Sequence, residues 1–327
     1  MFRTEIEINP SPVHMQHQHQ LLLMGSCFSD SIGKKLAEHK FQTFINPFGT
    51  LFHPVAIHSA ITSSIENTID PDLFFTRDDI WLHGAYHSQL FDVDKEKLIL
   101  TIQKQQAATH QIIRNADWLM LTYGTAFLYH VKSNQKWVAN CHKMPANLFD
   151  KQLSSLVSLE KDFDLFYQHI KKLNPKIKVL LTISPVRHTR DTLELNQVSK
   201  ATLRCFVHHV MQQHKDVHYF PAYEIMMDDL RDYRFYDRDL IHPNETAIDY
   251  IFEKFSQTFF SDDTRKLMNE WQTLKRELAH KAFHPSGKQH QHFLQNLSTK
   301  LQNLASRLDV REELKQVEKQ IIRPHEN

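Results

Sequence analysis

The sequence predicts an α/β protein whose mostly parallel sheet is covered by helices on both faces. Four apolar runs have the length and composition of buried strands, and each is followed by a helical pattern. Strands that alternate with helices in this way form parallel sheets with crossover helices. We expect strands at 20–24, 118–123, 178–184 and 217–223, a further strand at 40–46, and helices near 29–39, 97–115, 158–173 and 196–214.

Length and composition suit a globular protein of 327 residues with one large α/β domain, expected over 1–260, and a C-terminal extension over 261–327. The formal net charge of +1 gives no reason to expect a nucleic-acid partner. The N-terminus lacks the apolar core of a secretory signal, and no apolar run is long enough to span a membrane. Three cysteines, an odd number, suit a reducing compartment, so we expect a cytoplasmic protein.

The C-terminal extension has leucines at helical spacing on both sides of a His-Pro-Ser-Gly break at 284–287. This pattern predicts an antiparallel helical hairpin. We expect the hairpin to pack on its own domain; the alternatives are self-association through its apolar stripes or the binding of a partner helix. The stripes are Leu267, Trp271, Leu274 and Leu278 before the break, and Leu294, Leu297, Leu301, Leu304 and Leu308 after it.

The first predicted strand stops abruptly at Gly25, and Ser26 and Cys27 follow before a helix begins. A strand-to-helix corner of this kind can expose a nucleophile beside the positive end of the helix dipole, which favours an anionic side chain. A tight turn with a purely structural role would have the same sequence pattern. On these residues alone, both the choice between the two interpretations and the choice between Ser26 and Cys27 stay open.

A second polar group precedes the last helix of the predicted domain, where Asp239 stands three residues before His242. In an Asp-x-x-His loop the carboxylate can hold one imidazole nitrogen while the other nitrogen faces a nucleophile. Asp237 lies close enough in the sequence to compete for that role, and a capped helix entry with a solvated histidine is the simpler alternative.

These motifs resemble the SGNH/GDSL hydrolases and, more closely, the GSCFA family within that superfamily. The resemblance implies a flavodoxin-like three-layer α/β/α hydrolase fold and ester or acyl chemistry, without naming a substrate. One departure is Ser29, where the family name has Ala. The matching segments run in order as GSCFS (25–29), INPFGTLFHP (45–54), LTYGTAF (121–127), VANCHKMP (138–145), LTISPVRH (181–188) and LIHPNETA (240–247).

The resemblance also implies roles for individual residues. The superfamily nucleophile lies two residues after a glycine, which favours Cys27 over Ser26 here, with His242 as general base and Asp239 orienting it. Gly49 matches the second donor of the oxyanion hole, the group of N–H donors that stabilises the negative oxygen of the transition state.

The third donor of the superfamily, an asparagine two residues after a glycine, is missing because Ala126 follows Gly124 at that spacing. Residues that could replace the asparagine or line the substrate site are Asn46, Asn140, His142 and Lys143. Arg187 and His188 follow another buried strand and could bind a carboxylate or sugar hydroxyls.

No metal-binding or nucleotide-binding motif accompanies these residues, so we expect neither a metal nor a cofactor. The sequence therefore predicts an enzyme acting on ester bonds, an esterase or deacetylase that forms an acyl-enzyme on Cys27 or Ser26. Its expected substrate is a small ester or an O-acylated carbohydrate. The alternatives are an acyltransferase that uses the same site, and a non-catalytic binding or scaffold protein that keeps the fold.

Overall fold

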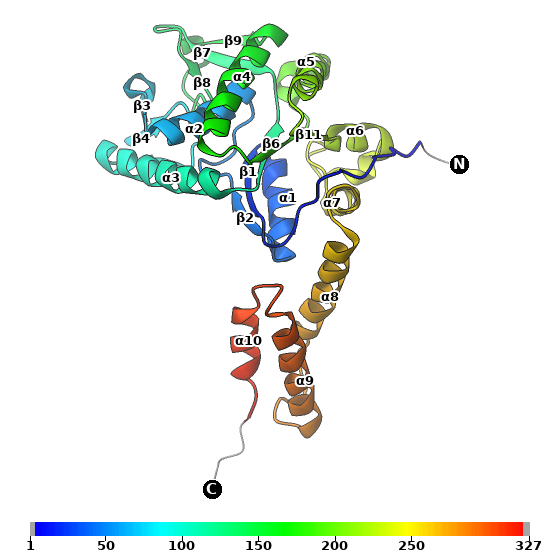
Figure 1. Ribbon diagram of the computed structural model, residues 1–327. Helices are drawn as coiled ribbons and strands as arrows, with labels where there is room; N and C mark the ends of the chain where they lie inside the picture. Colours follow the sequence, from blue (N-terminus) through cyan, green and yellow to red (C-terminus); the bar gives the residue numbers. More distant parts are fainter. Residues whose placement is uncertain (1–3, 323–327) are drawn as a thin grey trace.

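A five-stranded parallel sheet forms the centre of the computed structural model, which describes residues 4–322 (Figure 1). When its strands are numbered along the chain, their order across the sheet is 2-1-3-4-5, the flavodoxin-like order. The direction of winding therefore reverses between β1 and β6. Ligands of such sheets bind at this reversal, outside the carboxyl ends of the strands. The strands, in spatial order, are β11 (Val217–Phe220), β10 (Lys178–Ile183), β6 (Trp118–Tyr123), β1 (Gln20–Gly25) and β2 (Gln42–Ile45).

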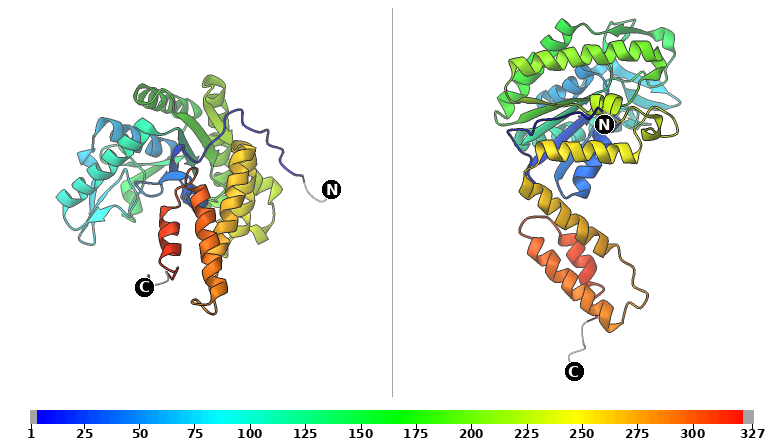
Figure 2. Two further views of the ribbon diagram at one scale, coloured as in Figure 1. Left: turned by 60° about the horizontal axis from the view of Figure 1, so that its bottom comes forward. Right: turned by 90° about the vertical axis from the view of Figure 1, so that its right-hand side faces the viewer.

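Helices cover both faces of the sheet because the strands are apolar on both sides (Figures 1 and 2). Leu22 and Met24 of β1 belong to the core beneath four helices, whereas Leu21 and Leu23 belong to the core beneath two others. The predicted α/β/α class is therefore confirmed. The first face carries α2 (Pro54–Glu66), α3 (Lys95–Asn115), α4 (Leu156–Leu173) and α5 (Thr192–Gln213), and the second carries α1 (Cys27–Glu38) and α7 (Glu245–Phe259).

The sequence patterns did not predict the elements inserted between the main strands. Helix α2 follows β2, and two small antiparallel sheets lie outside the parallel one. The first sheet contains β3 (Phe74–Arg77), β4 (Ile80–His83) and β5 (Phe91–Asp92), and the second contains β8 (Trp137–Val138), β7 (Phe127–Val131) and β9 (Phe149–Leu153). The shorter helical turns are η1 (Pro71–Leu73), η2 (Ala146–Leu148), η3 (Thr189–Asp191), α6 (Ala222–Glu224), η4 (Ile225–Asp229) and η5 (Tyr233–Phe235).

The C-terminal extension consists of α8 (Asp262–Leu278), α9 (Lys288–Leu304) and α10 (Arg311–Glu318). The predicted hairpin is α8 and α9, and both leucine stripes line its core; α10 is a third helix that the spacing did not reveal. The extension projects from the side of the domain that carries α1 (Figure 2). It docks there through Trp271, whose indole N–H donates to the carbonyl of Glu38 at 2.8 Å, and through an ion pair between Lys40 and Glu313. No helix of residues 4–322 is both long enough and apolar enough to cross a membrane.

One glycine decides how closely β1 and β6 approach at their carboxyl ends. Gly25 has a φ of +143°, and a Cβ atom there would lie 2.2 Å from the carbonyl oxygen of Thr122 on β6. Because backbone cannot move aside as a side chain can, only glycine fits this position.

We predict that Gly25→Ala lowers the free energy of unfolding by more than about 2 kcal/mol, because the methyl group must push β1 and β6 apart. Gly287→Ala serves as the control, since Gly287 lies in an ordinary conformation at the start of α9 and should change stability by less than about 1 kcal/mol. Urea unfolding of the two variants measures both values. Equal losses would contradict the close approach described here.

Candidate active site

The β1–α1 corner, residues Gly25 to Cys27, is held by hydrogen bonds on both sides. The N–H of Gly25 donates to the side-chain oxygen of Asn46 at 2.9 Å, and the Gly25 carbonyl accepts from Leu51 at 2.9 Å. The N–H of Ser26 donates to the carbonyl of Thr122 at 3.1 Å. The corner therefore has a fixed shape before any substrate binds.

Ser26 is the N-cap of α1 and has no exposed surface. Its hydroxyl accepts from the N–H of Phe28 at 3.3 Å and donates to the hydroxyl of Ser184 at 2.9 Å. Both contacts belong to the fold, because the first caps the helix and the second ties the corner to the end of β10. An enclosed hydroxyl with these commitments is poorly placed to attack a substrate, which favours Cys27.

Cys27 is the first residue of α1 and is partly exposed. Burial raises the pKa of its thiol, and the carboxylate of Asp30 raises it further. The backbone N–H groups of Cys27 and Phe28 and the charge of Lys200 act in the opposite direction. The thiol is therefore protonated in the resting site, and a base is needed to make it nucleophilic.

His242 and Asp239 form the pair that the sequence predicts. The Nδ1 of His242 lies 2.7 Å from a carboxylate oxygen of Asp239, and the other oxygen accepts from the backbone N–H groups of Ile241 and His242. These bonds, that of the His242 N–H first, lower the pKa of Asp239 to about 2, so the carboxylate stays charged. Asp237 instead uses its backbone, donating to the carbonyl of His242.

The second ring nitrogen of His242, Nε2, takes no part in the contact with Asp239. The His242 side chain is 45% exposed, and its Nε2 has no hydrogen-bond partner within residues 4–322. The loop that carries it is tied to the loop after β10, where the N–H of Arg187 donates to the carbonyl of Ile241 at 3.3 Å. The Asp239–His242 pair thus belongs to the same carboxyl edge of the sheet as the β1–α1 corner.

Three polar residues of α5 make hydrogen bonds to the loops at this edge of the sheet. The sequence patterns did not single them out. Asn196, Ser199 and Lys200 are each at most 2% exposed. Asn196 accepts from the main-chain N–H of His188, and Ser199 accepts from that of Ala126. Lys200 donates to the carbonyls of Gly124 and Ser184. Their spacing places them on the buried face of α5, in line with Leu203 and Phe206. Polar residues at positions of an otherwise apolar helix face were the sequence signal that could have identified them.

The predicted oxyanion donors Gly49 and Asn46 make hydrogen bonds to each other and to the β1–α1 corner. The N–H of Gly49 donates to the carbonyl of Asn46 at 2.8 Å. The Asn46 side chain holds Gly25 with its oxygen and donates its amide to Asp30 at 2.7 Å. Both residues therefore shape the turn after β2: the backbone N–H of Gly49 is paired, and the Asn46 amide uses one of its two N–H groups on Asp30. The N–H of Gly49 is committed to Asn46 in this structure, and its role as an oxyanion donor stays a prediction.

The backbone N–H groups in the turn after β6 are also paired within the protein. The N–H groups of Gly124 and Thr125 both donate to the carbonyl of Phe52, at 2.7 and 3.1 Å, and that of Ala126 donates to Ser199 at 2.7 Å. Ala126 is fully buried in the core on the α2–α5 side. No donor at position 126 replaces the missing asparagine.

In the segment 140–143, the side chains of Asn140 and His142 make hydrogen bonds within the protein. The Asn140 side chain accepts from the N–H of His142, whose ring is 1% exposed. One ring nitrogen of His142 lies 3.0 Å from the Ser88 hydroxyl, and the other lies 3.0 Å from the carbonyl of His83. The ring of His142 therefore joins this segment to β4, and its role as a substrate ligand stays a prediction. Lys143 is exposed.

Arg187 and His188 occupy different environments after β10. The guanidinium of Arg187 lies 4.1 Å from the ring centroid of Tyr236, a cation–π contact. The ring of His188 meets Phe52 edge-on at 5.4 Å, and its Nε2 would lie 3.0 Å from a Cβ atom on Gly124. That nitrogen is buried and has no hydrogen-bond partner within residues 4–322. Burial, and then the charge of Lys200, lower the pKa of His188 to about 3, so the ring is neutral.

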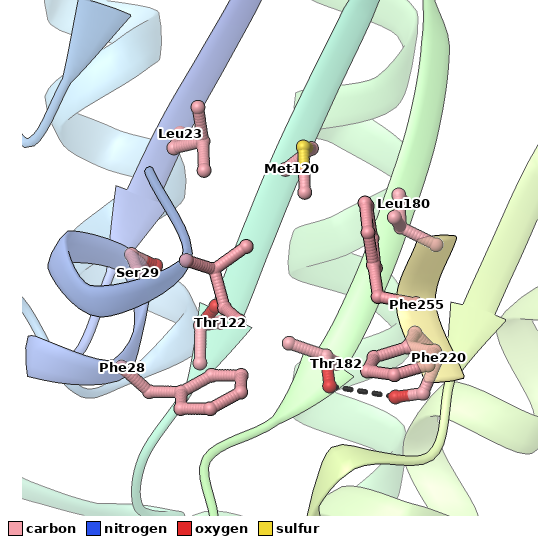
Figure 3. Close-up of a pocket in the computed structure, with 10 residues that line it drawn as sticks. Leu23, Phe28, Ser29, Met120, Thr122, Leu180, Thr182, Phe220 and Phe255 are labelled. Carbon is pink, nitrogen blue, oxygen red and sulfur yellow. Dashed lines mark hydrogen bonds between the residues drawn. The ribbon is translucent and has the colours of Figure 1, made fainter. Parts of the chain in front are cut away.

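A small apolar cavity of about 20 Å³ lies below the start of α1, between the sheet and α7 (Figure 3). Phe28, Thr122 and Thr182 line it toward the carboxyl ends of the strands, and Leu23, Met120 and Leu180 line it farther back along the strands (Figure 3). Cys27 and His242 are not among the lining residues, so the cavity belongs to the core. Within residues 4–322, no three His, Cys, Asp or Glu side chains gather in a group that could hold a metal ion.

We predict that stability rises with pH between about pH 7 and 10 through Lys200. Burial lowers the pKa of this amine to about 7 from its ordinary 10.5, so in that range the unfolded chain binds more protons than the folded one. Raising the pH through this range therefore favours folding. Urea unfolding at pH 6 to 10 should show this slope in the wild type and in exposed Lys161→Met, but a smaller slope in Lys200→Met. Equal slopes would contradict the burial of a titrating amine.

Known proteins resemble this chain in sequence and, distantly, in structure. The GSCFA family model matches residues 20–255, and the model of the GSCFA C-terminal domain matches residues 271–323. No curated protein matches the sequence. A solved structure of a carbohydrate esterase family 3 protein from Talaromyces cellulolyticus matches 78% of this chain and 99% of its own, with a TM-score of 0.37 and 8% identity. The family match covers more than half of the chain, and the protein therefore belongs to the GSCFA family.

Proposed function

We propose that the protein is an acyl-ester hydrolase of the SGNH/GDSL type that forms a thioester on Cys27. The observation that carries the proposal is the Asp239–His242 pair, joined at 2.7 Å with its outer nitrogen free. The pair lies at the carboxyl edge of the sheet, where Cys27 follows β1 as the first residue of α1. A nucleophile, a base and a carboxylate that orients the base are the parts that acyl transfer requires.

In the proposed reaction His242 Nε2 takes the thiol proton of Cys27, and the sulfur attacks the ester carbonyl carbon. The tetrahedral intermediate collapses to a thioester, and the alcohol leaves with the proton from His242. A water molecule then gives a proton to His242 and attacks the thioester. The carboxylic acid leaves, and the sulfur regains its proton from the imidazolium. Asp239 stabilises the imidazolium at each step through its charge.

We propose His188 and the backbone N–H of Cys27 as the donors that stabilise the tetrahedral oxygen. A neutral imidazole donates one hydrogen bond, and an unpaired buried ring nitrogen costs about 1–3 kcal/mol until a partner arrives. The place of His188 against Gly124 puts the ring at the end of the strand where the superfamily carries its asparagine. Arg187, beside Tyr236, is proposed to contact the substrate farther out.

The proposed substrate is a small ester or an O-acylated carbohydrate, since His242 is half exposed and an extended alcohol portion can reach it from solvent. An acyltransferase would use the same thioester, with a second alcohol in place of water. A non-catalytic scaffold is the third candidate, supported by the missing asparagine. A thiol nucleophile must stay reduced, which agrees with the cytoplasmic location that we propose.

We predict that Cys27→Ala and His242→Ala each lower hydrolysis of p-nitrophenyl acetate at least about 100-fold, because they remove the nucleophile and the base. Ser26→Ala should retain measurable turnover while losing about 1 kcal/mol of stability, the effect of a lost N-cap. Matched controls are Cys205→Ala and His208→Ala, both at exposed positions of α5. Spectrophotometric rates and urea unfolding provide the two readouts.

The nucleophile assignment is wrong if Ser26→Ala abolishes turnover and Cys27→Ala does not. If wild-type protein hydrolyses neither p-nitrophenyl acetate nor a thioester analogue above the buffer rate, and a panel of alcohols accepts no acyl group from it, the scaffold interpretation replaces the enzyme.

We predict that replacing His188 slows one reaction of Cys27 and leaves the rate of another unchanged. Acylation by p-nitrophenyl acetate develops a negative oxygen and should slow about 100-fold in His188→Ala, whereas alkylation by iodoacetamide develops none and should keep its rate. His188→Asn, which restores an N–H donor, should recover part of the acylation rate. Equal slowing of both reactions in His188→Ala would instead indicate general damage to the site.

A further inference from the structure

The side chain of Arg187 is held against two tyrosine rings in the loop after β10. It is half-buried, and its guanidinium lies 4.1 Å from the ring centroid of Tyr236 and 5.4 Å from that of Tyr233. In the part of the chain that the structure describes, no carboxylate lies within ion-pair distance of this guanidinium. Arginine keeps its charge at any ordinary pH, and its planar fork of N–H groups matches the two oxygens of a carboxylate.

Arg204 on α5 shows what a complete arrangement of this kind contains. Its guanidinium lies 4.6 Å from the ring centroid of Tyr219 and pairs with the carboxylate of Glu224 at 3.0 Å. Glu224 also accepts from the hydroxyl of Tyr219 at 2.7 Å, so the ring, the cation and the anion form one closed set. Arg187 has the ring and the cation of such a set, and a ligand that brings a carboxylate would complete it.

The loop around His242 fixes the place of Arg187 relative to the proposed base. The backbone N–H of Arg187 donates at 3.3 Å to the carbonyl of Ile241, the residue before His242. Tyr236, whose ring lies against the guanidinium, forms a β-bridge with Pro243, the residue after His242. The cation and the proposed base therefore belong to one hydrogen-bonded unit, which sets the spacing between them.

We infer that Arg187 binds a carboxylate of the substrate and so selects esters that carry a negative charge. The inference rests on the proposed function and narrows its substrate class to O-acylated hydroxy acids and O-acylated acidic carbohydrates. Sugar hydroxyls alone would satisfy the N–H groups of Arg187 but would leave its charge unbalanced, whereas a carboxylate does both. Because the bound carboxylate lies away from the reacting ester bond, Arg187 acts on the choice of substrate.

The test compares the binding of unreactive substrate analogues with and without a charge. In 3- and 4-acetamidobenzoate an amide replaces the ester, and the two isomers hold the carboxylate at two distances from the acyl group; the matching acetamidobenzamides are neutral. We expect isothermal titration to show that the wild type binds at least one carboxylate about tenfold more tightly than its neutral counterpart. Arg187→Gln should remove this preference, and Arg187→Lys, which keeps the charge but not the planar fork, should retain part of it.

Arg190→Gln is the matched control, because it removes the same charge from an exposed position of the same loop. We expect this variant to keep the wild-type preference to within about twofold, since an exposed charge acts weakly at a distance. Circular dichroism and urea unfolding verify that each variant is folded. The inference is overturned if the wild type prefers neither carboxylate, including the case in which no ligand binds. It is also overturned if Arg190→Gln removes the preference as fully as Arg187→Gln does.

Hydrolysis of 3- and 4-acetoxybenzoate and of their methyl esters separates this inference from the proposed function. The ratio of kcat/KM for the acid to kcat/KM for its methyl ester should fall about tenfold in Arg187→Gln. Binding of the acetamido analogues requires no catalysis. A carboxylate preference in a protein that hydrolyses none of these esters would therefore uphold the anion site and reject the proposed function. An active esterase whose binding shows no such preference would reject the inference alone.

Discussion

The close approach of β1 to β6 at Gly25 is the constraint on which the rest of the site depends. The two strands flank the point where the winding of the sheet reverses, and their carboxyl ends must converge for Ser26 to bond the backbone of Thr122. That contact aims α1 so that its first residue, Cys27, lies at the edge of the sheet with the helix N-terminus behind it. A side chain at position 25 would separate the strands and move the thiol away from the loops after β6 and β10.

A second set of interactions holds those loops from within the protein. The polar side chains of α5 bond the main chain at Gly124, Ala126, Ser184 and His188, all of which lie in the loops after β6 and β10. Buried donors and acceptors of this kind stabilise one arrangement of the loops, because a displaced loop would leave them unpaired. The candidate active site therefore combines two partly exposed groups, Cys27 and His242, with a buried set of supporting polar side chains on α5.

The sequence predicted the parts of the molecule that follow from local patterns. Buried apolar runs identified the strands of the central sheet, and the Asp-x-x-His spacing identified a pair that needs only one loop to form. The small antiparallel sheets escaped because their strands are short and only partly apolar. Lys200, Gly49 and His142 could not be assigned, because their roles depend on which main-chain groups other segments bring to them. One sequence contains no direct record of such long-range pairings.

The central claim is that the acyl group is carried by Cys27, and rapid acid quenching after mixing with p-nitrophenyl acetate tests it most directly. Peptide mapping by mass spectrometry then locates the acetyl group. The account predicts an acetyl group on the peptide that contains Cys27, removed by hydroxylamine at neutral pH as a thioester is, and absent in Cys27→Ala. An acetyl group on Ser26 that resists hydroxylamine, or no acetylated peptide at any time during turnover, would contradict it.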